Sequence, residues 1–92
     1  MDEVTIVINN LNSTITDKEL CANIRGRLQL GGILTQEPNA SGIARNGDIL
    51  VITVGVFGTI MKDSIETIVA RSLTCLSNDQ VASYASFEVN CH

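Results

Sequence analysis

A pair of glycines after an apolar run is the feature of this chain that could bind a small anion. Gly55 and Gly58 follow the run 49–54, and Thr59 comes directly after them. Backbone amides exposed at a strand-to-helix turn can bind a phosphate or a carboxylate. The segment lacks the Lys-Ser/Thr of a P-loop and the third glycine of the dinucleotide fingerprint. Gly55, Gly58 and Thr59 are therefore candidates for a small-anion site, and the alternative is that the glycines only permit a sharp reversal of the chain.

Catalytic and metal chemistry have little support in the sequence. The one histidine, His92, is the last residue, whereas acid–base catalysis needs a positioned imidazole. The three cysteines, Cys21, Cys75 and Cys91, show no CxxC spacing, so they form no metal motif. Cys21 and Cys75 fall on or beside apolar helical stripes, which favours core packing. We therefore expect a protein that is not an enzyme and that uses no metal and no cofactor.

Composition and charge exclude further classes of function. The chain has 92 residues, of which 45% are hydrophobic and 17% charged, and its net charge is −4. Its six Lys and Arg residues are scattered, whereas nucleic-acid binding needs a concentrated positive face. The apolar content argues against disorder, and no apolar run approaches the length of a bilayer span. We expect one domain over residues 1–92, with neither nucleic acid nor membrane as a partner.

The cysteines and the first residues also predict a location. An odd number of cysteines in a short chain does not form a disulfide framework. The start Met-Asp-Glu-Val shows no basic segment followed by an apolar one, as a secretory leader would. Both observations favour a reducing, cytoplasmic setting.

The first third of the chain predicts a strand and a well-marked helix. The β-branched run 4–8 stops at two asparagines and reads as a strand. Thr16 and Glu19 form a capping box, with Ile15 and Leu20 placed as a hydrophobic staple. The helix should begin at Asp17 and run to about residue 30, before the two glycines that follow.

The segment 31–48 leaves two alternatives open. Either Ile33–Gln36 is a short edge strand, or a functional loop is centred on Pro38–Gly47. The sequence Asn46-Gly47-Asp48 then predicts a tight turn. It leads into Ile49–Val54, which is apolar on both faces and therefore typical of a central strand covered by helices or by a partner.

The last 35 residues predict a second helix and a final strand. The helix begins near Thr59 or Asp63, and its apolar stripe contains Ile65, Ile68, Val69, Leu73 and Leu76. It should end at Ser77–Asp79. The segment Val81–Val89 alternates as a strand does, with Ala82 and Tyr84 on the outward face.

The order of elements is β-α-(β)-β-α-β. With right-handed crossovers this order favours an α+β, ferredoxin-like two-layer sandwich, in which a mostly antiparallel sheet carries two helices on one face.

Two regions are candidates for contact with another protein. Arg25 and Arg27 place two cations on the outer face of the first helix, on either side of Gly26, which costs about 1 kcal/mol relative to alanine inside a helix. Ala82 and Tyr84 would extend a sheet across an interface if the final strand lies at an edge. The alternative for the arginines is a solvated helix face.

Two segments of the second half resemble a known family. The stretch 47–55, an apolar strand that ends in a glycine turn, and Arg71-Ser72-Leu73-Thr74-Cys75-Leu76 are similar to the effector-associated constant component family. Cys75 stands where that family commonly has tryptophan. The resemblance implies a non-enzymatic adaptor of a bacterial defence or conflict system, and it carries over no catalytic residue.

These observations together predict a non-catalytic interaction or adaptor module that recruits a protein partner or assembles with itself. The alternatives are a regulatory domain that senses a small anionic ligand and an inhibitor protein of the phage type.

Overall fold

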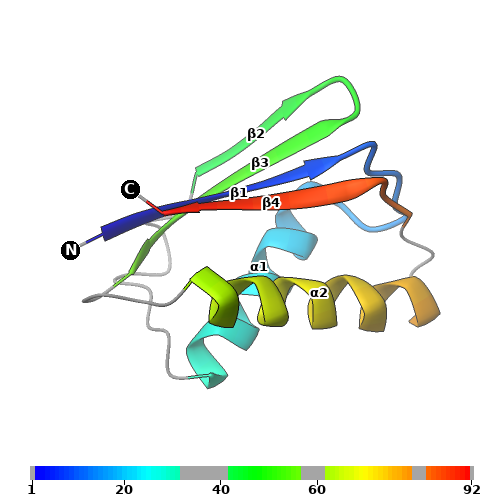
Figure 1. Cartoon of the computed structure of the whole chain (residues 1–92). Helices are drawn as coiled ribbons and strands as arrows, with labels where there is room; N and C mark the ends of the chain where they lie inside the picture. The colour runs from blue at the N-terminus through cyan, green and yellow to red at the C-terminus, as the bar shows by residue number, and fades with distance from the viewer. Residues whose placement is uncertain (1, 32–41, 57–61, 80–82, 92) are drawn as a thin grey trace.

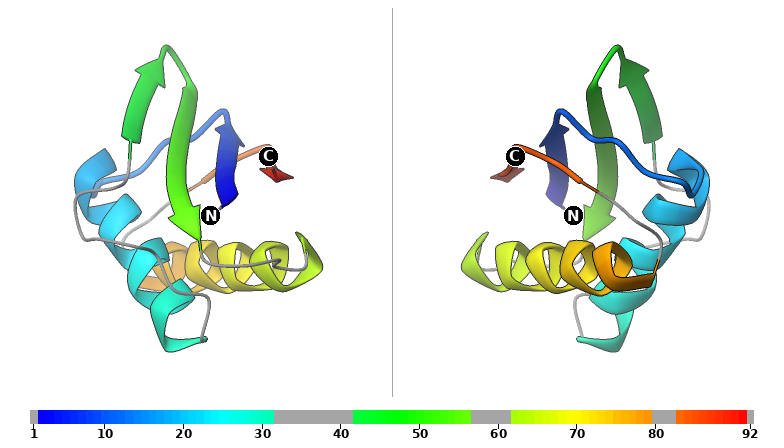
Figure 2. Two further views of the ribbon diagram at one scale, coloured as in Figure 1. Left: turned by 90° about the vertical axis from the view of Figure 1, so that its left-hand side faces the viewer. Right: turned by 90° about the vertical axis from the view of Figure 1, so that its right-hand side faces the viewer.

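Six elements follow one another in the predicted order and build two layers (Figure 1). The computed structural model describes residues 2–31, 42–56, 62–79 and 83–91. The elements are β1 (Asp2–Asn9), α1 (Asp17–Leu30), β2 (Gly42–Asn46), β3 (Ile49–Val56), α2 (Lys62–Asp79) and β4 (Ser86–Cys91). The four strands form one sheet, and both helices lie against the same face of it (Figure 2).

The strand order is β2-β3-β1-β4, and every neighbouring pair is antiparallel. The connection through α1 leads from the central strand β1 to the edge strand β2. The connection through α2 leads from the central strand β3 to the other edge strand, β4. These two interleaved β-α-β units make the ferredoxin-like fold, so the predicted architecture is confirmed.

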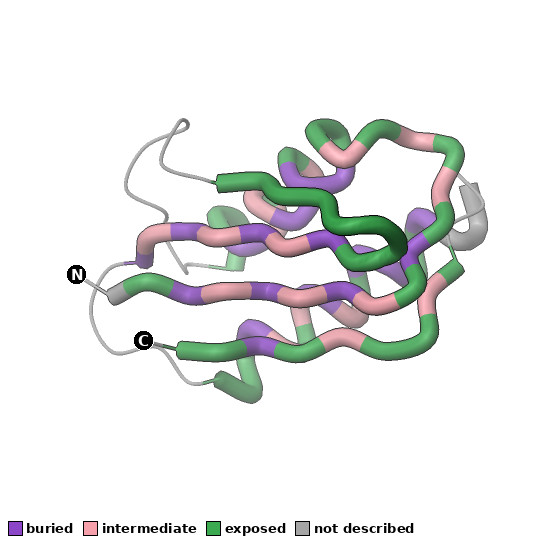
Figure 3. The backbone as a smooth tube through the Cα atoms, turned by 90° about the horizontal axis from the view of Figure 1, so that it is seen from above, coloured by how far each residue is buried: buried purple, intermediate pink, exposed green. Residues whose placement is uncertain are grey.

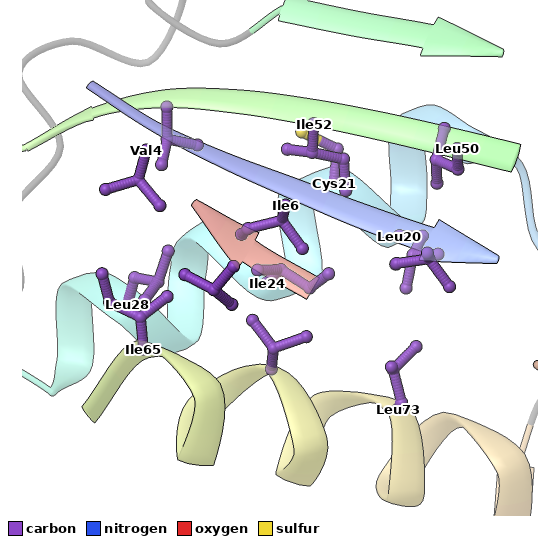
Figure 4. Close-up of a cluster of buried hydrophobic side chains, with 14 of the residues drawn as sticks. Val4, Ile6, Leu20, Cys21, Ile24, Leu28, Leu50, Ile52, Ile65 and Leu73 are labelled. Atoms are coloured by element: carbon purple, nitrogen blue, oxygen red, sulfur yellow. The ribbon is translucent and has the colours of Figure 1, made fainter. Parts of the chain in front are cut away.

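The core lies between the sheet and the helices, because the central strands alternate strictly (Figure 4). In β3, Leu50, Ile52, Val54 and Val56 are buried, while the residues between them face the other side of the sheet. Each such side chain contributes about 1.5–3 kcal/mol when it leaves water. The other buried apolar side chains include Val4, Ile6, Ile8, Leu20, Ile24, Leu28, Ile65, Val69, Leu73 and Val89.

α1 begins where its cap predicts. Thr16 is the N-cap, and its hydroxyl accepts a hydrogen bond from the Glu19 amide at 3.1 Å. The helix ends at Gly31, whose φ of −78° any residue could adopt. Glycine is therefore not required there for a left-handed backbone. A Cβ at Gly31 would lie 3.0 Å from Cδ1 of Ile68. Glycine therefore lets the end of α1 approach α2 closely.

α2 begins at Lys62, between the two predicted starts, and ends at Asp79 as expected. The predicted apolar stripe is confirmed: four of its members are buried and Ile68 packs partly buried against them. Ser72 is also fully buried on this stripe, and its hydroxyl donates to the Ile68 carbonyl at 2.9 Å.

The strand before the tight turn, β2, lies within the segment predicted as a loop. The segment Ile33–Gln36 lies outside the described residues, and Gly42–Asn46, assigned to a loop within Pro38–Gly47, is the strand β2. That loop prediction is wrong over these residues. All five residues of β2 are exposed, so the sequence carries no alternation to reveal a strand there. The turn itself is confirmed: Gly47 has a φ of 62°, which suits glycine at the first position of a two-residue hairpin loop.

Candidate interaction surfaces

The three residues predicted to bind an anion are not all in the described part of the chain. Gly55 lies inside β3, opposite Glu3 of β1, and the strand continues to Val56. The strand therefore runs past its predicted end at Val54, and the predicted turn at Gly55 is wrong. Gly58 and Thr59 lie outside the described residues.

Tyr84 does not face outward as predicted, and Ala82 lies outside the described residues. Tyr84 is half-buried against the core, with its ring centroid 6.2 Å from that of Phe87. The cause is a local irregularity: the Ala85 amide donates to the Asn9 carbonyl at 2.9 Å, although Ser86 is the register partner of Asn9. Two residues thus oppose one, as in a β-bulge, and the alternation shifts by one residue.

Arg25 and Arg27 do not lie on the outer face of α1. Both are half-buried beside the buried stripe, while Gly26 between them is exposed and has open space around its Cα. The Arg27 Nε donates to Asn23 Oδ1 at 3.3 Å. The prediction of two outward cations is wrong, because Arg25 and Arg27 flank the buried stripe and, of these three residues, Gly26 alone is in the exposed class.

The cysteines divide into one core residue and two surface residues. Cys21 is buried, as expected, but Cys75 is exposed, so its predicted core position is wrong. Cys91 is exposed as well. Among the described residues, no three His, Cys, Asp or Glu side chains come together as a metal site would require.

β2 forms one edge of the sheet and is exposed along its whole length (Figure 3). Its largest apolar side chain, Ile43, is 42% exposed. The strand is held by pairing with β3, from Gly42 opposite Thr53 to Asn46 opposite Ile49. Its position therefore depends on the backbone and on the turn, and hardly on burial of its own side chains.

Arg45 ties β2 to the start of α1. Its Nη2 donates to Asp17 Oδ1 at 2.6 Å, its Nε to Asp17 Oδ2 at 3.0 Å, and its Nη1 to the Leu11 carbonyl at 3.2 Å. The hydrogen bonds to the Asp17 carboxylate raise the pKa of the Arg45 guanidinium above its usual value. The pair engages the one charged side chain of β2, so no unpaired charge stands on this edge.

The backbone of β2 offers hydrogen-bonding groups that no other described strand pairs with. Antiparallel partners alternate between pairs that exchange two hydrogen bonds and pairs that exchange none. The residues that flank a two-residue loop form a bonded pair, so Asn46, Ala44 and Gly42 direct their backbone groups toward β3. Ile43 and Arg45 therefore direct an N–H and a C=O each away from the sheet. Proline and bulges, which would block a further strand, are absent from β2.

β4, at the opposite edge, is protected in two ways. The bulge at Ala85 and Ser86 interrupts its start, and Glu88 places an exposed charge beside β1. Bulges and charged side chains are the means by which sheets discourage the addition of a strand.

The sheet face opposite the helices, called the open face below, is covered by no described residue (Figure 3). Its centre is uncharged: Val7 and Val51 are half-buried opposite each other, and Ile49 is 37% exposed. Among the described residues, Glu3 and Glu88 are the carboxylates on it. All six Lys and Arg residues are described, and none lies on this face, because five are on the helices and Arg45 lies opposite the core residue Leu50.

A shallow groove runs between α1 and α2 and is called the helix groove below. One hollow of about 230 Å³ is lined by Arg27, Leu30, Gly31, Ile68 and Arg71. A second hollow of about 420 Å³ shares both arginines and continues along the exposed side of α2 to Thr74 and Cys75. No carboxylate is among the described residues that line either hollow. Leu30 is 89% exposed.

Arg71 is the freest of these cations. It is exposed, and no hydrogen bond or ion pair joins it to another described residue. No sequence motif marks Ile43, Arg45 or Arg71 as a contact residue. The turn at residues 46–48 is the signal that points to β2, since a tight turn before a strong strand implies an antiparallel partner just upstream.

The chain was compared with protein-family models, curated proteins and solved structures. No protein-family model, no curated protein and no solved structure matches the chain. No helix among the described residues is long and apolar enough to cross a membrane.

Proposed function

We propose that this chain is a non-catalytic protein-interaction module that binds an extended segment of a partner at the free edge of β2. The observation that carries the proposal is the outward-directed backbone of Ile43 and Arg45 on an exposed edge that lacks protecting features. Strand addition draws affinity from such backbone groups and selectivity from alternate side chains.

The neighbourhood of this edge favours an uncharged, β-branched segment. Ala44 lies beside Val51 on the open face, and Val51 lies beside Val7, so the register forms a small apolar row that ends at β2. On the helix side, Ile43 retains exposed surface that an added strand would cover. Each of the four new backbone hydrogen bonds contributes about 1 kcal/mol, so side-chain burial must supply the remaining affinity.

The likeness of residues 47–55 and 71–76 to the effector-associated constant component family supports an adaptor role. We accordingly place the module in a cytoplasmic bacterial defence or conflict system. This setting is a separate part of the proposal, and the strand-addition site does not depend on it.

Ile43→Pro tests the edge directly. It removes an outward N–H without removing a hydrogen bond to β3, and proline is accepted at such edge positions. Ile43→Thr is the matched control, because it keeps the N–H and changes only the side chain. Tyr84 is not used, since its ring packs against the core and a change there would disturb the fold.

The measurement is native mass spectrometry of tagged variants isolated gently from the source cells. We expect the wild type and Ile43→Thr to carry a stoichiometric protein partner, and Ile43→Pro to lose it while its melting temperature stays close to that of the wild type. Recovery of the wild type as a bare monomer, or equal partner binding by Ile43→Pro, would contradict the proposal.

A further inference from the structure

The open face and the helix groove carry opposite charge. The open face holds Glu3 and Glu88 and none of the six Lys and Arg residues of the chain. The helix groove, on the other layer, brings Arg27 and Arg71 together and contains no carboxylate among its described lining residues. A chain of net charge −4 thus presents a local cationic surface in the helix groove and an acidic one on the open face.

The same two surfaces also match in their apolar parts. Leu30 projects beside the groove with 89% of its surface exposed. The centre of the open face offers Val7, Val51 and Ile49, which are incompletely covered. Apolar groups surrounded by complementary charges are the arrangement found at the centre and rim of protein interfaces.

We propose that copies of this chain associate head to tail, with the open face of one copy docked on the helix groove of the next. Symmetric alternatives lack this complementarity. Two open faces packed together would oppose Glu3 and Glu88 of both copies with no cation between them. Two grooves packed together would oppose four guanidinium groups. Only the contact between unlike surfaces pairs carboxylates with arginines.

This geometry fixes how the assembly behaves. A contact between unlike surfaces leaves one free surface at each end, so growth continues unless the rotation closes a ring. Exposed ion pairs are screened by salt, so association weakens as ionic strength rises. The β2 edge takes no part in the contact, which makes this inference independent of the strand-addition site.

Charge reversal tests the contact. The groove variant combines Arg27→Glu with Arg71→Glu, and the face variant combines Glu3→Arg with Glu88→Arg. Because Arg27 also bonds to Asn23, Arg71→Glu alone serves as a second groove variant. The control, Lys18→Glu with Lys62→Glu, changes the net charge as much as the groove variant does but alters cations that do not line the groove.

Average mass is measured by sedimentation and light scattering, at low and high salt and over a wide range of protein concentration. We expect the mass of the wild type, the control and Ile43→Pro to rise with concentration at low salt and to fall with added salt. The groove and face variants should each stay monomeric with nearly unchanged melting temperatures. An equimolar mixture of the two should associate again, since each then meets opposite charge on the other.

Three results would overturn the inference. The first is a wild type that stays monomeric at millimolar concentration and low salt. The second is a discrete dimer that both variants retain, which indicates a symmetric contact elsewhere. The third is a mixture that remains monomeric although the wild type associates.

Discussion

The two edges of the sheet are held by different forces. β4 is held by its side chains: Val89 is 1% exposed, and Phe87 packs with Tyr84 against the core. β2 is held by backbone pairing, by a glycine turn and by one ion pair, and its largest apolar side chain, Ile43, is 42% exposed.

This difference separates stability from binding. A strand whose side chains are buried has little surface to offer a partner, and β4 is further closed by its bulge and by Glu88. A strand held mainly by its backbone keeps apolar surface and outward amides available. The edge that contributes least to the core is therefore the one we assign to recognition.

Truncation of one side chain at each edge should give the largest difference in stability between the two edges. We expect Val89→Ala to lower the free energy of unfolding by about 2–3 kcal/mol, because it leaves a cavity in the core. Ile43→Ala should lower it by less than about 1 kcal/mol, since much of that side chain is already in water. Urea unfolding followed by circular dichroism measures both, with Glu88→Ala as an exposed control. Equal losses at the two edges would show that β2 is held by its side chains after all.

The turn that positions β2 should have the next largest effect. Gly47 has a φ of 62°, where a Cβ costs about 1–2 kcal/mol. Since no atom lies within 4 Å of a Cβ built there, the loss in Gly47→Ala comes from the backbone alone. Gly47→Asn should lose less, because asparagine accepts this conformation. A Gly47→Ala protein as stable as the wild type would mean that the hairpin does not depend on this turn.

The sequence predicts those parts of the fold that depend on buried stripes and local caps. Thr16 and Glu19 predict the start of α1 at Asp17, and the apolar spacing predicts which side of each helix is buried. These signals succeed because each is local in the sequence and is expressed through side-chain burial or through one side-chain hydrogen bond.

Three other features leave no apolar–polar alternation in the sequence: β2, the bulge before β4 and the helix groove. β2 has five exposed residues, so only its turn marks it. The bulge before β4 moves Tyr84 to the core side, because one extra residue reverses the face of every residue beyond it. The helix groove joins Arg27 of α1 to Arg71 of α2, and only the packing of the two helices brings them together.

Loss of the ion pair between Arg45 and Asp17, called the clamp below, should have the smallest effect on global stability. Its effect on the local stability of β2 should be large. Both side chains are about one-third exposed, at 33% and 30%, so Arg45→Ala should cost only about 1 kcal/mol. Asp17 also favours the N-terminus of α1, so a double-mutant cycle of Arg45→Ala with Asp17→Asn is needed to isolate the pair.

Hydrogen exchange should show where the clamp acts. We expect the β2 amides bonded to β3, those of Gly42, Ala44 and Asn46, to exchange faster in either variant, while β1 and the β1-facing amides of β3 are unchanged. If protection from exchange falls uniformly across the sheet, β2 opens only when the whole domain unfolds, and the two edges are equally stable. If it falls in β2 alone, that edge can loosen independently, and a partner strand that binds there would also stabilise the hairpin.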